Sequence, residues 1–303
     1  MDIAEILTQG KQGRYFRATR KLKYPELVSH ITQRAAGLEP LFVEDNDYLW
    51  MLGLLKDWTA KASLDLYAFC LMPNHIHLLM RPQKDNLYGA MRDLFSQYAR
   101  YFNRKYERKG HLFGGPYRQS VVLNETYLLA ASLYIHLNPV RAGLAKQPLR
   151  YRWSSSRLYL ETTERKSFVN SGFILGMIAE DLQVARRTYR TLLQQAAGIE
   201  TGEILEEEKA IQRLLDKLQA SLPEGWKKVI RGPLNNLMGR AGIDDEQLAR
   251  ALEALKRKGG IATAESRQAR KYVIDQLIAR GFKRYEIAEW LGVSTKTLYN
   301  YLN

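Results

Sequence analysis

Residues 64–82 constrain the fold more than any other part of the chain. The run LDLYAFCLM at 64–72 is apolar at nearly every position, which is typical of a β-strand with both faces covered. Pro73 and Asn74 favour a tight turn, and HIHLLMRP at 75–82 then returns as the second arm of a hairpin. The chain therefore needs an inner hairpin with other layers packed on both of its faces.

The segments on either side of this hairpin alternate between strand and helix patterns. Alternating or β-branched runs indicate strands at 26–36 and 118–124. Amphipathic spacing predicts helices at 45–62, 86–108 and 125–143. The resulting order, β-α-β-β-α-β-α, predicts an α+β fold in which helices pack against a small antiparallel sheet.

The charge of the chain favours a polyanionic partner. Its 303 residues hold 46 Lys and Arg against 32 Asp and Glu, and residues 1–160 carry +10 of the net +14. Nucleic acid is the commonest partner of such a protein.

The single cysteine, Cys70, excludes a disulfide framework and a Cys-rich zinc site. No apolar run reaches 18 residues and the N-terminus is acidic, so we expect no membrane association and a cytoplasmic, nucleoid-associated protein.

His75 and His77 form the sharpest local motif. Residues two apart on a strand share a face, so both imidazoles point the same way while Ile76 enters the layer behind. Two neutral imidazoles at this spacing supply two corners of a divalent-metal site. The alternative is a pair of histidines that are only hydrogen-bonded or exposed.

Tyr134 and Asn138 lie four residues apart on the predicted helix at 125–143 and so share one face. The Asn138 amide oxygen is a candidate third metal ligand, and the Tyr134 hydroxyl a candidate nucleophile for a phosphate. The alternative is that Tyr134 is a core residue and Asn138 only precedes Pro139, which also makes the one-turn spacing approximate. His136 faces elsewhere and is expected to have a structural role or to contact DNA.

Three longer motifs resemble the REP-associated tyrosine transposases of the HUH single-strand DNA transposase superfamily. They are AFCLMPNHIHLLM at 68–80, YARYFNRKYERKGHLF at 98–113 and YIHLNPVRAGL at 134–144, followed by WSS at 153–155. The resemblance covers about the first 160 residues. It implies a ferredoxin-like domain of the HUH type at 1–165.

The resemblance also assigns the chemistry. It implies that His75, His77 and Asn138 hold Mg²⁺ or Mn²⁺ and that Tyr134 is the catalytic tyrosine. Proteins of this family cleave and rejoin hairpin-flanked single-stranded DNA, often a repetitive palindrome, through a 5′-phosphotyrosine intermediate. Two other functions stay open: a DNA-binding regulator without catalysis, and a replication-type HUH nickase.

Basic and aromatic residues near these motifs are expected to contact DNA. They are Arg34, Arg100, Arg104, Lys105, Tyr117, Arg118 and Arg141. The arm at 14–23 is either a DNA-binding arm or a solubilising tail. The chain departs from the family at 32–35, which reads Thr-Gln-Arg-Ala instead of Ser-Arg-Gly-Asn, and at Pro116, where arginine is more usual.

The C-terminal end resembles a helix-turn-helix. Residues 283–303 contain two short helical patterns around Gly292 and the candidate N-cap Ser294, similar to the C-terminal DNA-binding domain of the replication initiator DnaA. The residues expected to reach a duplex groove are Thr295, Lys296, Thr297 and Asn300. We therefore expect a DNA-binding module at 263–303, joined by a helical region at 166–262 without a readable motif. The sequence leaves the choice between monomer and homodimer open, together with the target DNA.

Overall fold

The structure is a computed structural model. It describes residues 15–17, 21, 25–37, 39–122, 125–162, 166–198, 214, 217, 248, 250, 252–255, 270, 271, 273, 274, 277, 278 and 282–302. Most of the predicted middle region at 166–262 and the predicted start of the C-terminal module at 263 lie outside these residues, as does most of the N-terminal arm.

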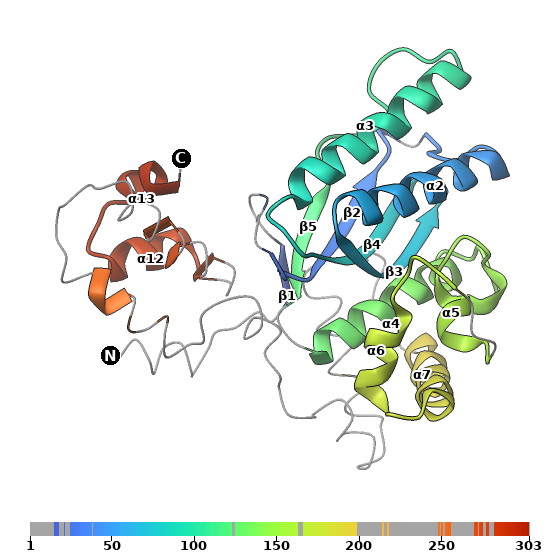
Figure 1. The fold of residues 1–303 in the computed structure, drawn as a ribbon. Coiled ribbons are helices and arrows are strands. Elements are labelled where there is room, and N and C mark those ends of the chain that lie inside the picture. The colour runs from blue at the N-terminus through green and yellow to red at the C-terminus, as the bar shows by residue number, and fades with distance from the viewer. Residues whose placement is uncertain are drawn as a thin grey trace.

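An antiparallel five-stranded sheet forms the centre of the N-terminal part (Figure 1). Its order is β1-β5-β2-β4-β3. The strands are β1 (Tyr15–Arg17), β2 (Ser29–Arg34), β3 (Leu64–Met72), β4 (His75–Pro82) and β5 (Arg118–Val122). The predicted hairpin is therefore confirmed as β3–β4, with Leu71 opposite Ile76 and Met72 opposite His75 next to the turn.

Helices cover both faces of the sheet, because its inner strands are apolar on both sides. The helices α2 (Asp45–Lys61) and α3 (Leu87–Lys105) lie side by side on one face (Figure 1). The helix α4 (Glu125–Arg141) packs against β3 and β4 from the other face. The predicted α+β fold, with helices packed on a small antiparallel sheet, is confirmed.

The outer edge of β3 is covered by the segment that carries the WSS motif. The Leu71 amide donates to the Trp153 carbonyl at 2.9 Å, and the Ser155 amide donates to the Phe69 carbonyl at 3.0 Å. Covering the edge of β3 in this way leaves it no free backbone groups for pairing with another chain at these positions. The motif therefore has a clear structural role.

The buried core continues past the predicted boundary at residue 165. After the short helices η1 (Pro148–Arg150) and α5 (Ser156–Leu160) come α6 (Ser171–Ile178) and α7 (Leu182–Ala197), which pack on each other and on α4. Residues of α6 and α7 belong to the same core cluster as the sheet. We therefore propose that the N-terminal domain extends to about residue 198.

Two further findings concern the ends of the chain. Residues 15–17 form β1, paired with β5, so this part of the arm adds a strand to the sheet. The C-terminal helices α12 (Arg284–Trp290) and α13 (Thr295–Leu302) exist and flank a turn in which Gly292 has φ of +64°. Within the described ranges, no helix is long and apolar enough to cross a membrane.

Candidate active site

His75 and His77 lie on one face of β4, as the strand spacing predicts. Their ring centres are 4.8 Å apart and the rings are nearly perpendicular. His77 pairs across the sheet with Thr32 of β2, and His75 pairs with Arg34. His77 is fully buried, whereas His75 is partly exposed.

A hydrogen bond holds the Nδ1 atom of each histidine. His75 Nδ1 lies 2.7 Å from Asn74 Oδ1, and His77 Nδ1 lies 2.9 Å from His30 Nε2. If Nδ1 of His77 donates to His30, the Nε2 atom of His77 keeps its lone pair and can bind a metal ion, as Nε2 of His75 can. His30 is thus part of the site, although it was not expected from the sequence.

Burial keeps all three imidazoles neutral. It lowers the pKa of His30 to about 4 and that of His77 well below 6.5. Burial, and then the nearby Arg34 cation, lower the pKa of His75 to about 4. A neutral imidazole is the form that binds a metal ion, so the pair is ready to act as ligands at neutral pH.

Helix α4 brings Tyr134 to these histidines within the same chain. The ring centre of Tyr134 lies 6.3 Å from that of His77 and 6.1 Å from that of His30, edge-on to both. The helix continues through Pro139 to Arg141, so Asn138 stays one turn after Tyr134 despite the proline. Pro139 lies in the last turn, where only one backbone hydrogen bond is lost. Both Tyr134 and Asn138 are fully buried.

The polar atoms at this site fit a bound cation. His77 Nε2 and both amide atoms of Asn138 are buried and make no hydrogen bond to any described residue. A buried polar atom without a partner costs roughly 1–3 kcal/mol, so such atoms mark a place for a ligand. Within the described ranges, no cluster of three His, Cys, Asp or Glu side chains is arranged to hold a metal ion, and the Asn138 amide is the third candidate ligand named from the sequence.

Three of the arginines expected to contact DNA lie beside this site. Arg34 and Arg118 are exposed and lie on the sheet face of His77. Arg34 pairs with His75, and Arg118 pairs with Thr32, the residue opposite His77. Arg141 is partly buried, with its guanidinium carbon 5.7 Å from the Tyr134 ring centre and a hydrogen bond of 3.3 Å to the Ala196 carbonyl. The structure therefore places cations on the sheet face of His77 and beside the Tyr134 ring.

Other residues expected at the DNA lie elsewhere. Arg100 and Arg104 are exposed on α3. Lys105 forms ion pairs of 2.6 Å with Asp47 and Glu44, so a phosphate would have to compete with these carboxylates for its charge. Tyr117 is 4% exposed, with the Lys21 ammonium 4.6 Å from its ring centre, which leaves little of the ring for a base to stack on.

His136 has a structural position. Its Nδ1 lies 2.8 Å from the Tyr189 hydroxyl of α7, and its Nε2 lies 2.8 Å from the Ser155 hydroxyl. Burial lowers the pKa of His136 to about 3. This neutral histidine therefore joins α4 to α7 and to the WSS segment, and it faces away from the Tyr134 ring.

On the C-terminal helix α13, Thr295, Lys296 and Asn300 are exposed and Thr297 is partly exposed. The Ser294 hydroxyl accepts a hydrogen bond of 3.0 Å from the Thr297 amide, which caps the helix as predicted. Leu298 and Ile287 are fully buried between the two helices.

Comparison with known proteins identifies a relative of the N-terminal domain. Residues 26–138 match the family described as "Transposase IS200 like". A solved structure, described as "Structure of the REP associates tyrosine transposase bound to a REP hairpin", is 15% identical, with a TM-score of 0.40, over 45% of this chain and 80% of that chain. No curated protein matches the sequence.

Proposed function

We propose that the chain is a metal-dependent transposase that cleaves and rejoins hairpin-flanked single-stranded DNA, because residues 26–138 match the IS200-like transposase family. One observation carries the proposal: the Tyr134 ring lies beside His77, whose Nε2 is buried without a partner among the described residues, as is the amide of Asn138. The proposed substrate class is the one bound by the solved relative, a tyrosine transposase with a REP hairpin.

The reaction exchanges one ester bond for another. The Tyr134 oxygen attacks the scissile phosphorus, the phenolic proton leaves to solvent, and the bond to the 3′-oxygen breaks as that oxygen takes up a proton. The product is a 5′-phosphotyrosine and a free 3′-hydroxyl. The phosphoester is retained in the linkage, so rejoining needs no other energy source. Because Tyr134 is fully buried, the side chains over it have to move before a phosphate can reach it.

We propose that His75, His77 and Asn138 hold the cation, Mg²⁺ or Mn²⁺. The donor set is two imidazole nitrogens and one amide oxygen, which are neutral, so a divalent ion keeps its charge for the phosphate. Such an ion polarises a phosphoryl oxygen and offsets the charge that develops on it. Arg34 and Arg118, exposed on the same sheet face, would hold phosphates on either side.

A pool of labelled hairpin oligonucleotides with randomised single-stranded flanks tests the proposal. Incubation with the protein and Mn²⁺ should give a covalent adduct on denaturing gels, and sequencing its DNA should reveal the cut position. Tyr134→Phe should bind the same pool yet form no adduct. Tyr127→Phe, a tyrosine change on the same helix, is the matched control and should still form it.

The result also distinguishes the competing functions. An adduct that persists in Tyr134→Phe would place the nucleophile elsewhere. Tight binding of the pool without an adduct in the native protein would support a DNA-binding regulator without catalysis. Cleavage without rejoining to a second oligonucleotide would favour a nickase.

We also propose that α13 binds duplex DNA beside the cleaved strand. The support is the exposed face formed by Thr295, Lys296 and Asn300 on a capped helix. Lys296→Gln should weaken binding of a random duplex and reduce the slope of its salt dependence by about one unit, as expected for one lost phosphate contact. An unchanged slope would rule out Lys296 as a phosphate contact.

A further inference from the structure

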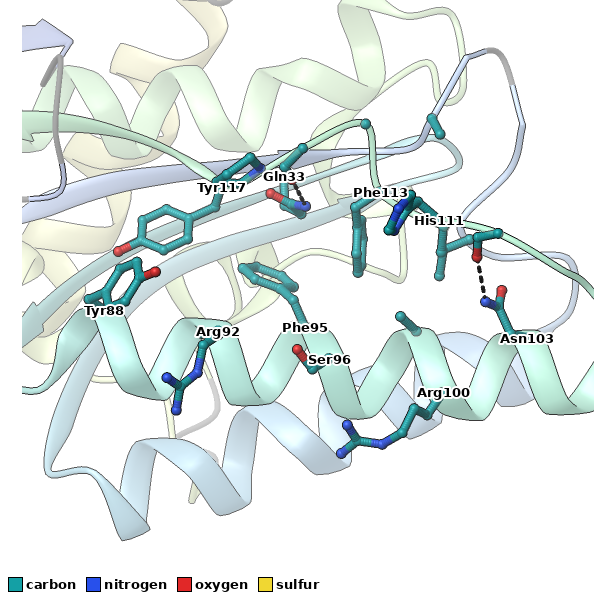
Figure 2. A pocket seen from close by; sticks show the side chains of 17 residues that line it. Gln33, Tyr88, Arg92, Phe95, Ser96, Arg100, Asn103, His111, Phe113 and Tyr117 are labelled. Atoms are coloured by element: carbon teal, nitrogen blue, oxygen red, sulfur yellow. Dashed lines mark hydrogen bonds between the residues drawn. The ribbon is translucent and has the colours of Figure 1, made fainter.

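A groove of about 930 Å³ lies between α3 and the segment 110–117. Figure 2 shows Phe95, Phe113 and Tyr117 between the helix and this segment, with Arg92 and Arg100 along α3. This volume is at the upper end of the range, roughly 300–1,000 Å³, of pockets that hold small organic ligands. We name it the α3 groove. Nothing in the proposed reaction requires it.

The α3 groove is separate from the histidine site but begins at the same end of the sheet. Gln33, which lines the groove, faces away from His77, because neighbouring residues on β2 point to opposite faces. The next residue, Arg34, lies opposite His75, and its carbonyl accepts a hydrogen bond of 3.1 Å from the Gly114 amide. A DNA strand that runs from the histidine site past Arg34 therefore reaches the α3 groove directly, around the end of the sheet.

The shape of the α3 groove is fixed by hydrogen bonds at both ends. The Asn103 amide donates to the Gly110 carbonyl at 2.9 Å, and the Gln33 amide donates to the Gly115 carbonyl at 3.0 Å (Figure 2). Gly115 has φ of +146°, and a Cβ at Gly114 would lie 3.1 Å from the Ala35 carbonyl oxygen. Gly114 and Gly115 thus allow the backbone of the segment 110–117 to follow this course beside α3. The groove therefore does not need a ligand in order to form.

Its lining is suited to flat aromatic groups with a negatively charged backbone. Tyr88 is 39% exposed at one end, and the Phe95 and Phe113 rings meet edge-to-face with centres 5.4 Å apart. The Tyr117 hydroxyl, near Tyr88 in Figure 2, makes no hydrogen bond to any described residue, but it is buried, so a base edge reaches it only when the neighbouring side chains move. The exposed Arg92 and Arg100 lie about two turns apart on the helix, at the rim where phosphates would run, and there a phosphate would compete with Asp93, which forms an ion pair of 2.8 Å with Arg92.

We propose that the α3 groove holds unpaired bases of a DNA single strand, those that flank the phosphate cleaved at Tyr134. Its identification as a subsite of the cleaved strand rests on the proposed function, whereas the binding of unpaired bases does not. Stacking on aromatic side chains accepts any base, and the rim arginines add attraction for the backbone. A duplex cannot insert bases into the groove, because its bases are already stacked and paired.

Photo-crosslinking of the full chain to a 20-nucleotide oligothymidylate with bromodeoxyuridine at alternate positions locates the bases. Without metal, crosslinks should map to peptides of α3 and of 110–117. Tyr88→Ala should weaken binding of the unsubstituted oligothymidylate about five- to tenfold, the loss of one stacked base, and leave binding of a 20-base-pair duplex unchanged. Ser96→Tyr, which places a ring in the groove from an exposed helix position, should weaken oligothymidylate binding as much.

Trp50→Ala removes another exposed aromatic ring, on α2 outside the groove, and should leave oligothymidylate affinity unchanged. Crosslinks that map elsewhere, or equal losses of affinity for duplex and single strand, would overturn the proposal. The assay involves no cleavage, so a protein that forms no Tyr134 adduct yet shows these crosslinks contradicts the proposed function alone. A protein that forms the adduct but shows no groove crosslinks contradicts only the inference.

Discussion

The Arg141 guanidinium carbon lies 5.7 Å from the centre of the Tyr134 ring, two turns along the same helix. A hydrogen bond from Arg141 to the Ala196 carbonyl of α7 holds the side chain in this place. A fixed cation beside a phenol favours its ionised form and attracts a phosphate. Arg141 is therefore placed to act on the proposed nucleophile, Tyr134, and on a phosphate bound beside it.

The first prediction concerns Arg141. Arg141→Gln should slow adduct formation about 10- to 100-fold, the loss expected for one charged group at the reacting phosphate. Its pH–rate profile should move to higher pH, because the phenolate loses the cation that favours it. Arg141→Lys should restore part of the rate of adduct formation and part of the original pH–rate profile. Lys146→Gln changes an exposed residue nearby and should alter neither the rate nor the profile. A slower rate with an unmoved pH profile would show that Arg141 acts only through the packing of α7.

The second prediction concerns the cation. His77→Ala should abolish Mn²⁺ binding measured by calorimetry and stop adduct formation, because it removes one of the three proposed ligand atoms, a buried Nε2 that makes no hydrogen bond to a described residue. Asn138→Asp, which retains an oxygen ligand, should bind Mn²⁺ at least as tightly, whereas Asn138→Ala should lose affinity. Asn46→Ala, an exposed amide on α2, is the control. Adduct formation that persists in EDTA would contradict the metal role.

The third prediction concerns stability at low pH. Burial alone would raise the pKa of the Asp47 carboxyl, but hydrogen bonds from Lys105, Tyr106 and two backbone amides outweigh it, and the pKa lies below its usual value. A lowered pKa in the folded state gives stability that is complete above the unfolded value, about 3.9, and is lost as the pH falls below it. Asp47→Asn should lower the free energy of unfolding by about 2 kcal/mol at pH 7.

Urea unfolding at pH 7, 5, 4 and 3 measures this contribution. The difference between native protein and Asp47→Asn should be constant from pH 7 to 5 and shrink below pH 4. A difference that stays constant down to pH 3 would show that the Asp47 charge contributes nothing. Asp57→Asn, an exposed aspartate on the same helix, should show no such difference.

The fourth prediction concerns the extent of the N-terminal domain. The Tyr189 hydroxyl of α7 contacts His136 at 2.8 Å and donates to the Ser132 hydroxyl at 3.0 Å, in a fully buried network. Tyr189→Phe should cost about 1–3 kcal/mol in urea unfolding, because His136 Nδ1 loses its partner. A chain that ends at residue 198 should unfold cooperatively, whereas one that ends at 165 should not. Cooperative unfolding of the shorter chain would support the boundary predicted at 165.

The sequence predicted most of the fold because its patterns are local. Strand alternation placed His75 and His77 on one face, and the helical repeat placed Asn138 one turn after Tyr134. The helices predicted at 45–62 and 125–143 match α2 and α4 to within two residues. These features depend only on residues close together in the chain, so one sequence is enough to specify them.

Other features arise between segments that are distant in sequence. His30 is 47 residues from His77, and only the register of β2 against β4 makes them partners. Similarly, the sequence does not reveal that Lys105 forms an ion pair with Asp47, because only the packing of α3 on α2 brings the two side chains together.

By itself the sequence determined the hairpin, the shared face of His75 and His77 and the helix that carries Tyr134, since the backbone repeats of strand and helix fix which side chains share a face. The tertiary structure alone decided that Tyr134 meets the histidines of its own chain, that α7 completes the core and that a groove opens beside α3. These outcomes depend on how whole elements pack, and packing is set by the shapes of many side chains together.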